Sequence, residues 1–124
     1  MIGQEAIKFV EENAQAKVLV IIPTLTERTQ ALRSIHRAAR NSFLCDGFDL
    51  DRNGARLRVD KGTGVFVAAM RSPRDIERIM GFCADNFLIM LVGSERMSIE
   101  TRDTIKDVVC AYGPDVQLQE YNTV

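Results

Sequence analysis

Two short stretches of this chain are apolar at every position, residues 18–22 and residues 87–92. A strand is apolar on both of its faces when helices cover both sides of its sheet, as in parallel sheets. Both stretches have the length of a strand and are far too short to cross a lipid bilayer. The pattern therefore predicts two central strands, with Val20 and Ile89 deep inside the sheet.

Three other stretches repeat apolar residues with the period of an amphipathic helix. One covers residues 3–15, one follows Thr24 and one follows Ser98. Thr24 and Glu27 have the spacing of a capping box, in which the hydroxyl accepts a hydrogen bond from a free helix amide and the carboxylate reaches back. We expect the second helix to end near Arg40. The positions predicted to face the core are Ala6, Ile7, Val10, Ala14, Leu32, Ile35, Ala39, Ile105, Val108, Val109 and Tyr112.

Shorter alternating patterns predict the remaining strands. Apolar and polar residues alternate on both sides of Asn53-Gly54, and these two residues accept the positive φ angles that a tight hairpin turn requires. Residues 64–70 and 116–121 predict two further strands, the second near an edge of the sheet.

The order of these elements predicts one α/β domain over residues 1–124. Helices alternate with apolar strands, which indicates a layered, mostly parallel sheet with helices on both faces, and the segment around Asn53-Gly54 adds a β-hairpin. A chain of 124 residues has the usual size of a single domain.

The predicted hairpin also contains part of the EF-hand calcium loop. Asp49, Asp51, Asn53 and Asp60 stand at positions one, three, five and twelve of that loop, with Gly54 at position six. The last ligand is an aspartate rather than the usual bidentate glutamate, and three arginines within the loop would repel a cation. We therefore interpret this segment as a hairpin and expect no metal.

Composition narrows the classes of function. A formal net charge of -1 gives no overall field that would drive the protein onto nucleic acid or a membrane. The N-terminal residues lack the cationic region and apolar core of a signal peptide. The three cysteines form no Cys-x-x-Cys pair, and only one histidine accompanies them, so we expect reduced thiols and neither a zinc site nor a cofactor. These features predict a cytoplasmic protein that does not enter the membrane.

The order of short motifs resembles the core of P-loop NTPases. Gly3-Gln4-Glu5 opens the first predicted helix, and the strand that follows it ends in Pro23-Thr24. In P-loop proteins a Gly-Lys-Thr opens the corresponding helix, and the next strand ends in Pro-Thr. Residues 23–30 resemble the helicase segment that touches the DNA backbone just after that strand.

Later motifs extend the resemblance to the large terminase subunits of tailed phages. Residues 53–57, 70–73, 79–81 and 84–89 follow one another as similar motifs do in those subunits, between the second strand and the Walker B strand. The resemblance implies a phage origin and descent from a terminase- or helicase-like core.

Departures from the family pattern argue against ATP hydrolysis. Gln4 stands where the lysine that contacts the phosphates belongs, and Glu5 replaces the hydroxyl that binds Mg²⁺. A carboxylate there would repel a phosphate. The Walker B aspartate is also missing, because Gly93-Ser94-Glu95 follows the apolar strand. The large electrostatic contribution to phosphoryl transfer is therefore absent.

A stripe of arginines is the candidate binding surface. Twelve of the sixteen cationic residues are arginine, which binds phosphate and carboxylate with two parallel hydrogen bonds. Arg33, Arg37 and Arg40 lie at i, i+4 and i+7 of the second predicted helix, and Gln30 and His36 border them. If the resemblance holds, this face follows the segment that tracks a nucleic-acid backbone. It also suits an acidic protein partner, and it is equally typical of a solvated helix face.

We therefore predict a non-enzymatic binding module that engages a protein or a nucleic acid through this stripe. Two alternatives remain. A small metal-dependent hydrolase or nuclease would use Asp46, Asp49, Asp51 and Glu95. A structural subunit would form a homo-oligomer through an edge of its sheet.

Overall fold

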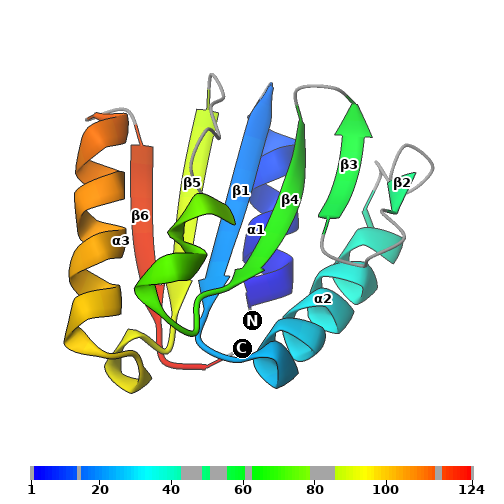
Figure 1. The fold of residues 1–124 in the computed structure, drawn as a ribbon. Coiled ribbons are helices and arrows are strands. Elements are labelled where there is room, and N and C mark those ends of the chain that lie inside the picture. Colours follow the sequence, from blue (N-terminus) through cyan, green and yellow to red (C-terminus); the bar gives the residue numbers. More distant parts are fainter. Residues whose placement is uncertain are drawn as a thin grey trace.

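The structure is a computed structural model that describes residues 2–13, 15–42, 49–50, 56–60, 63–78, 86–113 and 116–123. It confirms the predicted α/β fold (Figure 1). In chain order the elements are α1 (Ile2–Glu12), β1 (Ala16–Ile22), α2 (Leu25–Arg40), β2 (Asp49–Leu50), β3 (Arg56–Asp60), β4 (Thr63–Ala69), the 3₁₀ helix η2 (Pro73–Arg78), β5 (Asn86–Val92), the 3₁₀ helix η3 (Ser94–Arg96), α3 (Ile99–Tyr112) and β6 (Val116–Tyr121).

The six strands form one mixed sheet in the order β2-β3-β4-β1-β5-β6. The four strands from β4 to β6 are parallel, and β2 and β3 add to them in antiparallel orientation. The predicted mostly parallel sheet and its hairpin strands are therefore confirmed. The turn residues of the hairpin, Asn53 and Gly54, lie outside the described residues, as does the rest of the segment 51–55 of the calcium-like loop.

Helices cover both faces of the sheet and make two separate cores. On one face α1 and α2 pack against the even-numbered residues of β1, and on the other α3 and η2 pack against the odd-numbered ones. The central strands are buried as predicted, because Val20 is 0% exposed and Ile89 is 1% exposed. Within the described part of the chain, no helix has the length and apolar character needed to cross a membrane.

Side chains close the ends of the two longer helices. Thr24 Oγ1 accepts a hydrogen bond from the Glu27 amide at 3.2 Å and donates one to the Glu27 carboxylate at 2.9 Å, so the predicted cap is present. Ser98 Oγ accepts from the Thr101 amide at 3.1 Å in the same way. Gly113 then ends α3 with a φ angle of 92°, which favours glycine.

Some predicted core positions need correction. In α2 the fully buried stripe is Ala31, Ile35 and Ala39, and Leu32 is only partly buried at its margin. The small Ala31 takes the inner position because α2 packs closely against both the sheet and α1. In α3 only Ile105 is fully buried among the predicted residues, since this helix lies near the outer strands, where less of the sheet is available to cover it.

Candidate binding face on helix α2

Two sets of contacts fix the orientation of α2. Ala31, Ile35 and Ala39 anchor one side of the helix in the core that it shares with α1. α1 also approaches α2 so closely that a Cβ atom at Gly3 would lie 2.4 Å from the backbone oxygen of Ser34. Only glycine fits at position 3, and the opposite side of α2 is therefore held toward solvent.

The arginine stripe lies on this outward side. Gln30, Arg33, Arg37 and Arg40 are all exposed. The only acidic residue of α2 is Glu27, one turn before the stripe. Among the residues that the structure describes, no acidic side chain forms an ion pair with any of the three arginines. The stripe is thus a positively charged ridge that no carboxylate of the described residues neutralises.

His36 lies at the margin of the stripe and is partly buried. Burial, and secondly the positive charge of Arg40, lower the pKa of its imidazole below the usual 6.5. The ring is therefore neutral at physiological pH and adds no charge to the ridge. Its Nε2 atom is shielded from solvent and has no hydrogen-bond partner within the described ranges.

A small cavity separates the stripe from the start of α1. It has a volume of about 100 Å³ and is bordered by Gln4, Ser34, Arg37, Ala38 and Asn41. Arg37 thus stands over the first turn of α1, near the residue that takes the place of the phosphate-binding lysine in the P-loop pattern.

Glu5, the next residue of that pattern, is also engaged. The Tyr121 hydroxyl at the end of β6 donates a hydrogen bond to the Glu5 carboxylate. Burial, followed by the hydrogen bond and the negative charge of Glu5, raises the pKa of Tyr121 above its usual value. A carboxylate that accepts a hydrogen bond from a tyrosine hydroxyl therefore occupies the position that the P-loop resemblance assigns to the Mg²⁺-binding hydroxyl.

A second polar cluster, which the sequence did not suggest, lies where the parallel strands end. The Arg96 guanidinium contacts the carboxylates of Glu27 and Glu95 and donates a hydrogen bond of 2.8 Å to the backbone oxygen of Asn122. It lies directly over Gly93, where a Cβ atom would come within 2.2 Å of it. Gly93 has a φ angle of 67°, a conformation that favours glycine.

This cluster occupies the switch point of the sheet. The chain leaves β1 for α2 on one face and leaves β5 for α3 on the other, and open α/β sheets bind ligands between such strands. Here the Arg96 side chain occupies the position and contacts both nearby carboxylates, although its single positive charge balances only one of them. Glu27 and Glu95 are thus both engaged by the same cation.

The two described residues of the hydrolase alternative lie far apart in the sheet. Asp49 lies on β2 and Glu95 follows β5, with β3, β4 and β1 between them. Asp46 and Asp51 lie outside the described residues. In the ranges that are described, no three histidine, cysteine or acidic side chains come together as metal ligands.

Comparison with protein-family models, with curated proteins and with solved structures finds no match. The resemblance to P-loop NTPases therefore stays a hypothesis based on the motifs themselves. The function has to be argued from the surfaces of this chain.

Proposed function

We propose that this chain is a non-enzymatic binding module, derived from a terminase- or helicase-like core, that binds a nucleic-acid backbone through the outward face of α2. The observation behind the proposal is the ridge formed by Arg33, Arg37 and Arg40, which is exposed and has no counter-charge among the described residues. Arginine at such a site forms paired, charge-assisted hydrogen bonds with phosphate oxygens.

The spacing of the ridge suits a phosphate backbone. Seven residues separate Arg33 from Arg40, which corresponds to about 10 Å along a helix that rises 1.5 Å per residue. One strand of duplex DNA carries a phosphate every 3.4 Å or so along its axis, so the ridge spans about three phosphates. Three such contacts give weak, sequence-independent binding, with a dissociation constant on the order of 10⁻⁴ M.

The rest of the outward face favours nucleic acid over a protein partner. Between Thr26 and Arg40 every exposed position of α2 carries threonine, glutamine or arginine. Stable protein interfaces have an apolar or aromatic centre, and this stretch offers no such anchor. A ridge of charges on a polar surface is instead typical of a face that follows phosphates.

Two observations support a role without ATP hydrolysis. Glu5 accepts a hydrogen bond from Tyr121 at the start of α1, where a negative charge opposes a nucleotide phosphate. Arg96 contacts both Glu27 and Glu95 at the ends of the parallel strands. A carboxylate thus lies where the P-loop pattern has its phosphate site, and the carboxylates at the strand ends are already engaged by a cation.

Binding of fluorescent single-stranded and duplex oligonucleotides tests this proposal. At low salt the parent protein is expected to bind both, and the affinity should fall with a slope of about -2 to -3 in log K against log salt concentration, as for three phosphate contacts. The combined variant Arg33→Glu, Arg37→Glu and Arg40→Glu should not bind.

The matched control reverses three exposed cationic residues on other elements, Arg71, Arg74 and Lys106, to glutamate. It changes the net charge by the same amount and should keep at least half of the affinity. Equal loss in both variants would show a general charge effect rather than a site on α2. Absence of binding by the parent at low salt would refute the nucleic-acid proposal, and an acidic host protein that needs the three arginines would then replace nucleic acid as the partner.

A further inference from the structure

The strand β6 lies at the edge of the described sheet and lacks the lysine, proline and bulge that often protect such an edge. It pairs with β5 over all six residues, from Val116 to Tyr121, with no shift in register. It contains no lysine, arginine or proline, and four consecutive residues of it are exposed. Natural edge strands are commonly short, bulged, or interrupted by lysine or proline, because an open edge pairs with other chains.

The direction of one backbone group shows which part of β6 is unpaired. The Tyr121 carbonyl accepts a hydrogen bond of 2.7 Å from the Gly93 amide just after β5, so the backbone groups of Tyr121 point toward β5. Neighbouring residues of a strand point their backbone groups to opposite sides. The amides and carbonyls of Leu118 and Glu120 therefore point to the outer edge, where no strand of the described sheet follows.

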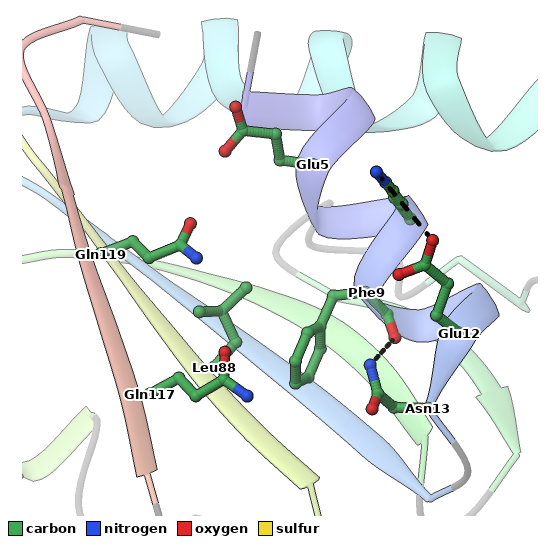
Figure 2. Close-up of a pocket in the computed structure, with 8 residues that line it drawn as sticks. Glu5, Phe9, Glu12, Asn13, Leu88, Gln117 and Gln119 are labelled. Carbon is green, nitrogen blue, oxygen red and sulfur yellow. Dashed lines mark hydrogen bonds and ion pairs between the residues drawn. The ribbon is translucent and has the colours of Figure 1, made fainter.

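Side chains next to this edge differ between the two faces of the sheet. On the α3 side Leu118 is 42% exposed, one of the few large apolar side chains that the described surface presents. On the other side α1 and β6 border an open groove of about 460 Å³ (Figure 2). Glu5 and Glu12 line this groove together with a single cation, Lys8, so its lining has a negative balance.

We infer that β6 accepts an extended peptide as an additional strand, with apolar residues on its α3 side and basic residues on its groove side. The outward backbone groups of Leu118 and Glu120 supply the hydrogen bonds, as in other cases of strand addition. An apolar side chain beside Leu118 removes that leucine from water. A lysine or arginine on the opposite side reaches the carboxylates of the groove.

A single extended strand suits this edge better than a second copy of the chain. In Figure 1, α3 lies along the outer side of β6. Antiparallel pairing of two β6 strands about a twofold axis would place both α3 helices on the same side of the joined sheet, and the two strands would be about 4.8 Å apart. Packed helices need 8–10 Å between their axes, so the two helices would collide.

Amide hydrogen exchange with a defined probe tests the inference. The probe is a blocked seven-residue peptide of alternating lysine and valine. In the protein alone, the amides of Leu118 and Glu120 should exchange quickly, while those of Gln119 and Tyr121 are protected by β5. At millimolar peptide the exchange of Leu118 and Glu120 should slow at least about tenfold. A peptide of alternating glutamate and valine should protect them less.

Proline variants identify the edge as the binding site. Leu118→Pro removes an outward amide and should abolish protection at Glu120, whereas Leu118→Ala keeps that amide and should retain most of the protection. If Leu118→Pro does not fold, Glu120→Pro makes the same test with Leu118 as the reporter. No protection in the parent, or protection that survives in a folded proline variant, refutes strand addition at β6.

Two further outcomes refute parts of the inference. Protection of Leu118 and Glu120 in the absence of peptide that grows with protein concentration would mean that a second copy occupies the edge. Equal protection by the lysine and glutamate peptides would mean that the groove does not select basic residues.

Discussion

The strands β1 and β6 are parallel to neighbours in the same sheet, and both pair with β5, yet they differ in almost every other respect. Six of the seven residues of β1 are buried, because β4 and β5 flank it and helices cover both of its faces. In the described sheet β6 pairs with a strand on one side only, and four of its six residues are exposed. Both strands thus pair with β5 in the same way, yet β1 belongs to the core and β6 belongs to the surface.

The comparison separates the strand that stabilises the fold from the strand that leaves backbone groups at the surface. In β1 the backbone hydrogen bonds and the apolar side chains are both removed from water, so a substitution there lowers the stability of the whole fold. In β6 the inner backbone groups hold the strand in place and the outer ones are available to a partner. Three experiments test this division, in order of decreasing expected effect.

The largest difference is expected for side-chain truncation. Val20→Ala in β1 or Ile89→Ala in β5 should lower the free energy of unfolding by about 2–4 kcal/mol, because each leaves a cavity in a fully buried layer. Leu118→Ala in β6 should cost less than about 1 kcal/mol, since much of that side chain is already in water. Urea unfolding measures both, and similar losses at Val20 and Leu118 would contradict the contrast between centre and edge.

A smaller difference is expected between two proline substitutions within β6. Gln119→Pro removes an amide that points to β5, whereas Leu118→Pro removes one that points outward. The first should destabilise the protein by roughly 1 kcal/mol more than the second, the usual net value of one backbone hydrogen bond. Thermal or urea unfolding of both variants gives this difference. If Leu118→Pro proves the more damaging, the assigned direction of the backbone groups is wrong.

The smallest effect concerns the hydrogen bond between Tyr121 and Glu5. Because the pKa of Tyr121 is raised in the folded protein, its contribution to stability is complete below the unfolded value of about 10 and is lost as the pH rises through the folded value. The parent should therefore lose stability above about pH 10 more steeply than Tyr121→Phe, with parallel curves between pH 6 and 9. If the stability of the parent and of Tyr121→Phe falls equally with rising alkaline pH, the hydroxyl of Tyr121 does not hold β6 to α1.

The sequence predicted the centre of this fold better than its surfaces. Uninterrupted apolar runs identified β1 and β5, because burial on both faces leaves no polar position that would blur the pattern. The cap at Thr24 was equally readable, since it depends on residues only three positions apart. Such local signals need no knowledge of the tertiary structure.

Contacts between distant segments could not be predicted in the same way. The sequence predicted Leu32 as a core residue of α2, whereas Ala31 takes that position because α1 lies so close to α2. The close approach of Gly3 to Ser34 joins two different helices, so no local pattern in the sequence reveals it. The cluster around Arg96 joins residues from three parts of the chain. The spacing of the arginine stripe was readable from the sequence, whereas the structure was needed to show that no described acidic side chain pairs with it.

The hydrogen bond between Glu5 and Tyr121 also has a consequence for the kinetics of folding. The two residues are 116 positions apart, so their contact closes a loop that includes nearly the whole chain. Loop closure costs about 0.6 kcal/mol more for each doubling of loop length, and contacts of this kind slow the search for the native topology. We expect β6 to dock against α1 after the central strands have formed. Until then the outer side of β5 is itself an open edge, and newly made chains are most prone to aggregate during that interval.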